Sequence, residues 1–513
     1  MSKAIIHSQT SAILMAGLLA IMVSHVGSTL HTEDSDAALN SKSNGHHCHE
    51  ARAVLERNWQ SATNSTIPSY GLYPHQWSWD SSFIAIGYSG YDSERARAEL
   101  SSLFRAQWSN GMLPHIVFNP KVPRGAYFPD DIWWKSEEDS LGRCPQGVKT
   151  SGIVDPPVHV MAALRVFKAH PSSATLSWLR SLYPSLRSWL DFLHRDRGSS
   201  DMGGLVWIRH PWESGMDNAP LWDGPLAALN SVSGCPANTE EPRPWSTSCV
   251  IPPFGRQDLA HSDPSMRPSN DTYNKFVYLL LHARNQSYDD SQMIDFPFRV
   301  IDVLFNTLLV QANLDLANIA SLLGHSQESQ QWAHRGDKLR EAMEGLWSDQ
   351  AQLYLNYDLA AGKWIQNRHV GGLAPLMLGT SLGPHRSALL RSVMSSAFSP
   401  AGGLAVATSP SDETTFDRRN YWRGPVWVNV DWLLLQGLSP QSAPAEMLVE
   451  SVRRAVELPG NGGFFEYFDP FTGAHRGTGN FSWTAALYHD TFCTGSNSQS
   501  ALRSPSVPTM VFA

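Results

Sequence analysis

The chain has 513 residues, 42% hydrophobic and 17% charged, so it can bury a large core and is not disordered overall. Its formal net charge is −8 and its Lys and Arg residues form no cluster, which excludes a nucleic-acid-binding protein. The chain also holds 19 Trp, 14 Tyr and 20 Phe. Flat aromatic faces suit the apolar faces of sugar rings but also fill ordinary cores, so composition only favours carbohydrate binding.

Residues 1–28 are predicted to be a signal peptide. Lys3 precedes an apolar run from Ala12 to Val23, which is too short for a comfortable membrane span. An uncleaved anchor is the alternative. We therefore expect a glycoprotein of the secretory pathway, in the extracellular space or an endomembrane lumen. The N-x-S/T sequons that fit this location are those of Asn64, Asn270 and Asn285, with Asn480 expected to stay unmodified.

Residues 29–50 are predicted to be a polar linker. Their histidines, His46, His47 and His49, could bind a metal, but short polar tracts of this kind are usually solvated. The five cysteines lack zinc-ligand spacing, so we expect no metal and no cofactor. A disulfide between Cys235 and Cys249 is a guess from the Pro-rich loop that they flank.

Residues 51–495 are predicted to form one helical domain. Apolar residues keep helical spacing over 96–104, 179–193, 305–323 and 339–347, whereas only 353–357 resembles a hairpin. The loops between these helices are rich in Trp, Gly, Pro and acids, which predicts helical hairpins closed into a ring with a pocket at one end. Residues 221–272 have little periodicity and are predicted to be a lid-like insertion. Residues 496–513 are predicted to be a C-terminal tail.

Two loops carry acids in aromatic, Gly-rich surroundings, where the pKa of a carboxyl group can be raised. Asp217 lies in the loop 210–220, and Glu466 lies between aromatic residues in the loop 462–473. Cleavage of a glycosidic bond needs two such acids. The structural alternatives are a helix cap for Asp217 and a hydrogen-bonded core acid for Glu466. Two further loops, 73–80 and 419–427, combine aromatic, amide and charged side chains as a sugar subsite requires, although each could be core packing.

The motifs in these loops resemble those of glycoside hydrolase family 63, within the branch of mannosylglycerate and glucosylglycerate hydrolases. The resemblance extends from about residue 51 to residue 490. The stretches that carry it are Gln76-Trp77-Ser78-Trp79-Asp80-Ser81, Asn110-Gly111-Met112-Leu113-Pro114-His115, Trp212-Glu213-Ser214-Gly215-Met216-Asp217-Asn218, Asn420-Tyr421-Trp422-Arg423-Gly424-Pro425-Val426-Trp427, Glu466-Tyr467-Phe468-Asp469-Pro470 and Phe481-Ser482-Trp483-Thr484-Ala485-Ala486.

This resemblance implies an all-α fold, the (α/α)6 barrel, and hydrolysis with inversion at the anomeric carbon. Asp217 matches the general acid and Glu466 the general base, and their carboxyl groups are expected to stand roughly 6.5–9.5 Å apart. The resemblance implies no obligatory cofactor and a small carbohydrate substrate, and no protein partner is evident. The residues that match the sugar pocket are Tyr73, Trp77, Trp79, Asp80, Trp212, Gly215, Tyr421, Trp422 and Trp427.

The chain departs from the family pattern in two places. Asp155 stands where related sequences often have Gln, and the insertion 221–272 has no matched motif. An anionic glycerate group requires a cation there, and Arg256 and Arg267 are the candidates. The best substrate prediction is 2-O-α-mannosyl- or glucosyl-glycerate. The alternatives are an α-glucosidase acting on short oligosaccharides and an inactive sugar-binding protein.

Overall fold

The computed structural model describes residues 45–229, 251–252 and 254–494, and the chain divides into the units Met1–Glu50 and Ala51–Ala513. In the first unit, residues 45–50, which fall within the predicted polar linker, are helical. The predicted signal peptide, the Cys235–Cys249 disulfide and the tail 496–513 lie outside the described residues. Cys144 is a free thiol.

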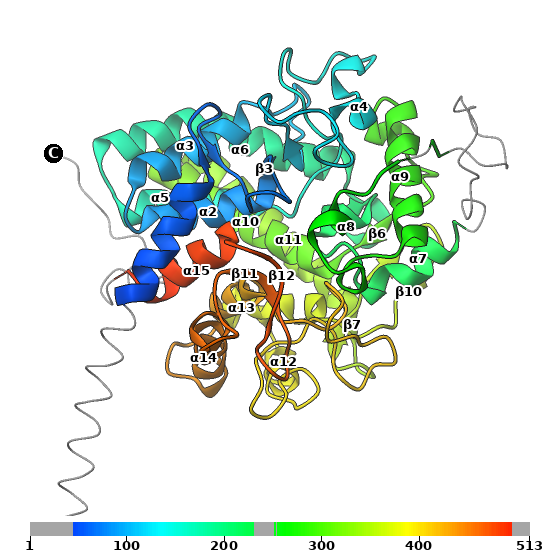
Figure 1. Ribbon diagram of the computed structural model, residues 1–513. Helices are drawn as coiled ribbons and strands as arrows, with labels where there is room; N and C mark the ends of the chain where they lie inside the picture. The colour runs from blue at the N-terminus through cyan, green and yellow to red at the C-terminus, as the bar shows by residue number, and fades with distance from the viewer. Residues whose placement is uncertain (1–44, 230–250, 253, 495–513) are drawn as a thin grey trace, which may run out of the picture. The chain divides into compact units, whose positions relative to one another are not determined.

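The second unit is built around a closed cycle of helices (Figure 1). Each member packs against the next one in the chain, and the last packs back against the first. The members are α2 (Ser78–Ser89), α5 (His159–Ala169), α10 (Val303–Leu322), η9 (Val370–Leu382), α13 (Val428–Leu435) and α15 (Ser482–Phe492). Every residue of α2 is buried, as expected for a helix with neighbours on all sides. By length and composition α10 could cross a membrane, but 83% of its apolar window is buried inside this fold.

A second layer of helices covers this cycle from outside. Each outer helix packs on the inner element that precedes it, so the chain alternates between the two layers as in an (α/α)6 barrel. The outer helices are α3 (Ser93–Phe104), α6 (Ser173–Asp196), α11 (Ser326–Met343), α12 (Arg386–Val393) and α14 (Ala443–Glu457). The predicted all-α class is confirmed.

The sequence of α6 explains why this helix packs in the outer layer. It buries Leu179, Leu182, Leu186 and Leu190 at helical spacing and leaves its other face polar. A capping box between Ser172 and Thr175 satisfies its first backbone donors. Each buried leucine contributes about 1.5–3 kcal/mol relative to an exposed one. The burial of this one apolar stripe therefore holds α6 against the inner layer of helices.

The described strands are short and lie in the connections between helices. The pair β11 (Phe465–Phe468) and β12 (His475–Gly479) is antiparallel, as is β3 (Gln76–Trp77) with β4 (Ile116–Val117). Instead of one hairpin at 353–357, the chain forms two. Their strands are β7 (Trp347–Ser348) with β8 (Leu353–Tyr354), and β9 (Tyr357–Asp358) with β10 (Lys363–Trp364). The helix predicted over 339–347 is wrong at its end, because α11 stops at Met343.

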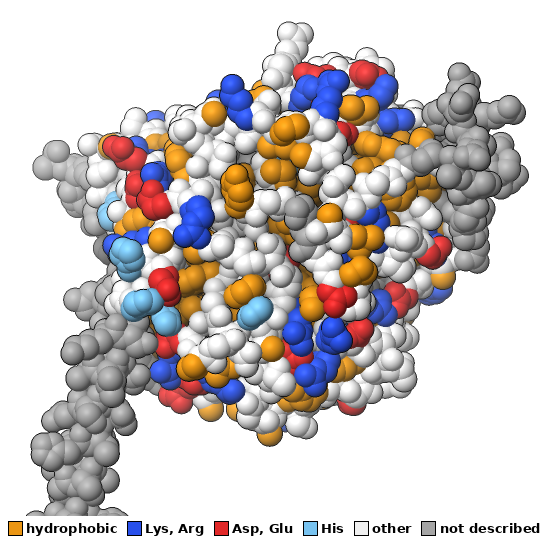
Figure 2. All heavy atoms as spheres, in the orientation of Figure 1, with side chains coloured by type: hydrophobic (Ala, Val, Ile, Leu, Met, Phe, Trp, Pro, Cys, Tyr) orange, Lys and Arg blue, Asp and Glu red, His pale blue; other side chains and the backbone are white. Residues whose placement is uncertain are grey.

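The distribution of charge on the surface agrees with the exclusion of a nucleic-acid-binding protein, which was made from composition. On the face drawn in Figure 2, acidic and basic side chains of the described residues are interspersed rather than gathered by sign. Such a face lacks the extended basic stripe that binds a phosphate backbone.

Candidate active site

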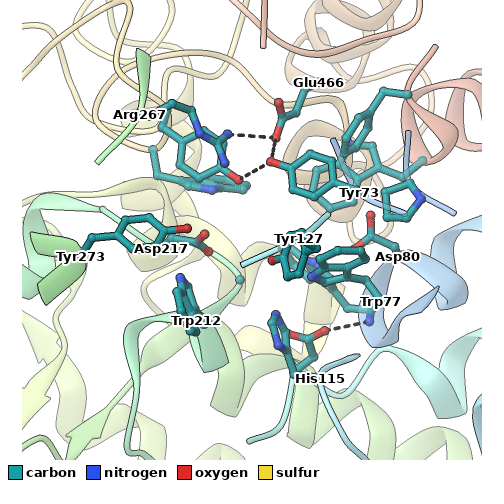
Figure 3. Close-up of a pocket in the computed structure, with 18 residues that line it drawn as sticks. Tyr73, Trp77, Asp80, His115, Tyr127, Trp212, Asp217, Arg267, Tyr273 and Glu466 are labelled. Carbon is teal, nitrogen blue, oxygen red and sulfur yellow. Dashed lines mark hydrogen bonds and ion pairs between the residues drawn. The ribbon is translucent and has the colours of Figure 1, made fainter. Parts of the chain in front are cut away.

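A pocket with a cavity volume of about 70 Å³ opens among the loops that join the inner and outer helices. Figure 3 shows its lining side chains converging from segments far apart in the chain. Most predicted site residues take part. Those that line the pocket are Tyr73, Trp77, Trp79, Asp80, Trp212, Gly215, Asp217, Arg267, Tyr421, Trp422 and Glu466.

Two predicted site residues do not line the pocket. Trp427 is fully buried behind Trp422, and the two rings stack with centroids 3.7 Å apart, so Trp427 supports the wall instead of forming it. Arg256 is held by Asp258 through hydrogen bonds of 2.6 and 3.0 Å and donates to the Pro268 carbonyl oxygen. Of the two candidate cations, only Arg267 reaches the pocket.

Several lining residues were not among the predicted site residues. Tyr127 lies in the loop between β4 and α4 (Asp131–Trp134), and Tyr273 lies on α9 (Asn270–Asn285), just beyond the insertion. An aromatic residue next to an irregular segment was the available signal for both. Five further residues line the pocket without having been predicted as site residues. They are Pro68, His115, Asp155, Phe481 and Trp483.

Glu466 projects from β11, and both of its carboxylate oxygens are held. Oε1 accepts a hydrogen bond of 2.7 Å from the Tyr73 hydroxyl, and Oε2 accepts one of 3.2 Å from the Thr478 amide. The hairpin permits this because Gly477 has φ of +67°, and a Cβ there would lie 2.3 Å from Oε2. Burial raises the pKa of Glu466, while Arg267 and the Tyr73 hydroxyl act in the opposite direction. The carboxylate is thus oriented, and these two groups offset part of the effect of burial on its charged form.

Asp217 follows the short helix η3 (Pro211–Ser214) and a tight turn at Gly215. Gly215 has φ of +71°, and a Cβ there would lie 2.6 Å from the Trp79 ring, so only glycine lets the loop approach that ring. Burial raises the pKa of Asp217 to about 7, against the opposing effect of Arg267. Near neutral pH this carboxyl group can therefore hold a proton to give away.

Two further acids, Asp80 and Asp155, line the pocket, and Asp80 lies on the opposite side of it from Arg267 (Figure 3). Asp80 is in the first turn of α2, and Asp155 accepts a 3.1 Å hydrogen bond from the Trp79 amide through Oδ2. The other oxygen of Asp155 is 3.9 Å from His115 Nε2. Burial raises the pKa of both carboxyl groups. These groups offer hydrogen bonds to the hydroxyls of a sugar.

Arg267 brings a positive charge to the pocket from the end of the predicted insertion. Its Nε is 3.2 Å from Asp258 and its Nη1 is 3.6 Å from Glu466 Oε1. The guanidinium carbon lies 4.3 Å from the centre of the Tyr421 ring, a cation–π contact. Nη1 is buried and donates no hydrogen bond to any described residue. This nitrogen is available to an anionic group of a ligand.

Among the described residues, 45–229, 251–252 and 254–494, one cluster of side chains could hold a metal ion. It consists of His46, His47 and Glu50. It belongs to the first unit and not to the unit that holds the pocket.

Known proteins resemble this chain over most of its length. It is 40% identical to the mannosylglycerate hydrolase of Rubrobacter radiotolerans over 454 residues, 87% of this chain and 96% of that protein. It is 32% identical to the glucosylglycerate hydrolase of Mycolicibacterium hassiacum, covering 82% and 92% of the two chains. The crystal structure of the family 63 mannosylglycerate hydrolase of Thermus thermophilus with Tris and D-glycerate matches with a TM-score of 0.75 and 35% identity, covering 86% and 99%.

The predicted secretory-pathway location is wrong by this comparison. The relatives from Rubrobacter, Thermus and Mycolicibacterium are bacterial proteins, and the segment that was predicted to be a signal peptide lies outside the described residues. The sequons at Asn64, Asn270 and Asn285 therefore lose their interpretation, since short N-x-S/T triplets arise by chance in any long chain.

A family model places the chain more firmly. The model of the mannosylglycerate hydrolase MGH1-like glycoside hydrolase domain matches residues 73–484, a range that contains nearly the whole pocket lining. The chain therefore belongs to the MGH1-like glycoside hydrolase family, within glycoside hydrolase family 63.

Proposed function

We propose that this enzyme hydrolyses a small α-linked glycerate glycoside, 2-O-α-mannosylglycerate or 2-O-α-glucosylglycerate, with inversion at the anomeric carbon. The observation that carries this proposal is one pocket holding a buried acid with a pKa near 7, an oriented carboxylate and a buried arginine nitrogen without a hydrogen bond. The names of the relatives supply the substrate class.

The reaction is a single displacement. Protonated Asp217 donates to the glycosidic oxygen while the bond from that oxygen to the anomeric carbon breaks. Ionised Glu466 takes a proton from a water molecule, whose oxygen forms the new bond on the opposite face of the ring. Tyr73 and the Thr478 amide keep the Glu466 carboxylate aimed at that water. The products are glycerate and the sugar with inverted anomeric configuration.

The pocket divides the substrate between two sides. Trp77, Trp79, Asp80 and Asp155 form the sugar side. Arg267 binds the glycerate carboxylate, where a charge-assisted hydrogen bond contributes about 1.5–3 kcal/mol. Arg256 has no direct role, because its donors are occupied by Asp258 and Pro268. Its guanidinium instead lies 4.0 Å from the Tyr273 ring centre and supports that wall.

A substrate panel tests the proposal. Purified enzyme is incubated with mannosylglycerate, glucosylglycerate and maltose, and released glycerate and sugar are quantified, with proton NMR reporting the first anomer formed. We expect glycerate release and the β-anomer. Release of glucose from maltose alone would favour the α-glucosidase alternative, and no release from any substrate would favour a sugar-binding protein.

Arg267→Met separates the leaving-group role from general damage. We expect its KM for the glycerate substrate to rise by about 10- to 150-fold, the range that 1.5–3 kcal/mol implies. The matched control is Arg256→Met, which removes a neighbouring buried arginine outside the pocket. An equal rise of KM in both variants would contradict the assignment.

A further inference from the structure

Four buried charged side chains lie behind the loop that carries Asp217. They are Arg197, Arg209, Glu213 and Asp290, and none of their side chains is more than 2% exposed. Arg197 makes a bidentate pair with Glu213, at 2.9 and 3.0 Å, and its Nε is 2.8 Å from Asp290. Arg209 also pairs with Asp290. Two cations and two anions balance, so the cluster is neutral as a whole.

Glu213 is the member of this cluster that belongs to the Asp217 loop. It lies in η3, four residues before Asp217. Besides the two Arg197 nitrogens, the Arg209 amide donates to Oε2 at 2.7 Å and the Val154 amide donates to Oε1 at 3.2 Å. Burial acts to raise the pKa of Glu213, but the two arginines outweigh it and hold the pKa below its usual value. The group is therefore a fully bonded carboxylate.

These contacts join the acid loop to the sugar side of the pocket. Val154 is bonded to Glu213, and the next residue, Asp155, accepts the amide hydrogen of Trp79. Trp79 in turn packs against Gly215 in the acid loop. The buried Glu213 carboxylate thus connects the loop that carries Asp217 with the segment that lines the sugar side. These two parts of the chain must keep the acid and the sugar ring correctly placed relative to each other. Asp290 has the same arginine partners but lies on η7 (Asp290–Gln292), in a third segment of the chain.

We propose that Glu213 is a positioning residue that aims Asp217 at the glycosidic oxygen by tying its loop to the segment of Val154 and Asp155. The proposal rests on Asp217 being the general acid. It assigns Glu213 a role that a purely structural ion pair lacks, because misplacing an acid by about 1 Å costs on the order of 10²-fold in rate. The loss then falls on the protonation step alone.

Two substrates separate that step from the rest of the reaction. The glycerate glycoside needs a proton on its leaving oxygen, whereas the matching α-glycosyl fluoride releases fluoride with little need for an acid. We expect Glu213→Gln to lower kcat about 10- to 100-fold on the glycoside and less than about 3-fold on the fluoride. The matched control is Asp290→Asn, which also removes one negative charge from the cluster and is expected to affect both substrates equally.

Asp217→Asn serves as the reference for a lost acid. Suppose that Asp217→Asn loses most of its activity on the glycoside but keeps its activity on the fluoride. An equal loss on both substrates in Glu213→Gln would then overturn the positioning role of Glu213 and leave the general-acid assignment intact. Equal losses on both substrates in Asp217→Asn would overturn the general-acid assignment itself. The same difference in Asp290→Asn as in Glu213→Gln would also overturn the proposal, since the effect would then follow from charge and not from the loop contact.

A second variant covers the case in which Glu213→Gln does not fold. Ser214→Ala leaves the ion cluster intact but removes the hydroxyl that accepts the Met216 amide at 2.9 Å and donates to the Pro211 carbonyl oxygen at 2.6 Å. We expect the same preference for the fluoride, at about 3- to 10-fold. Unchanged relative rates in Ser214→Ala would contradict the idea that the rigidity of this loop aims the acid.

Discussion

Tyr73→Phe tests how the Glu466 base is kept ionised. The Tyr73 hydroxyl donates at 2.7 Å to Glu466 Oε1, and this bond favours the charged form of the carboxyl group. A hydrogen bond to a charged group contributes about 1.5–3 kcal/mol, and 1.36 kcal/mol corresponds to about one pKa unit. The substitution should therefore raise the pKa of Glu466 by about one to two units. Because the base acts in its ionised form, the acidic limb of the pH profile of kcat/KM should move to higher pH by that amount.

The assay is glycerate release across the pH range, fitted to a two-limb profile. The matched control is Tyr467→Phe, which removes the hydroxyl of the next residue in β11. That hydroxyl donates to the Met266 carbonyl oxygen at 3.1 Å and not to Glu466. An unmoved acidic limb in Tyr73→Phe, or an equal shift in Tyr467→Phe, would refute the reasoning. Circular dichroism on both variants checks that the fold is kept.

Three further predictions follow from the same geometry. The rate should fall as pH rises through about 7, because Asp217 must be protonated, and this basic limb should be missing from the residual activity of Asp217→Asn; a limb unchanged in that variant would assign it to another group. Gly215→Ala should lower kcat by at least about 10-fold and lower the melting temperature, since a Cβ would lie 2.6 Å from the Trp79 ring at a positive φ, whereas Gly224→Ala, with open space around it, should do neither. Arg197→Met should cost about 3–5 kcal/mol in urea unfolding because Glu213 and Asp290 stay buried with fewer partners, and a loss below about 1 kcal/mol would show that the cluster tolerates an uncompensated charge.

Helix content could be predicted from the chain alone, and so could the two acids as candidates for the site. The leucines of α6 and the apolar run of α10 repeat with the period of a helix, and that signal is local. Asp217 and Glu466 stood out because aromatic and glycine neighbours surround each within its own loop, and the motifs around them matched a family. Local signals fail at boundaries, which is why the predicted helix over 339–347 ran past the end of α11 at Met343.

The sequence did not show which side chains face the pocket, because that depends on how the helical ring closes. Trp422 and Trp427 belong to one motif, yet only the first reaches the cavity, and of Arg256 and Arg267 only the second does. Arg256 is held by Asp258, its near neighbour in the chain, whereas Arg267 packs on Tyr421, which is distant along the chain and is brought there by tertiary packing. The contacts of Glu213 with Arg197 and Val154 likewise join segments that are distant along the chain. A sequence pattern reports what each segment buries, whereas the direction of a loop side chain depends on neighbours that only the folded ring brings within hydrogen-bonding distance.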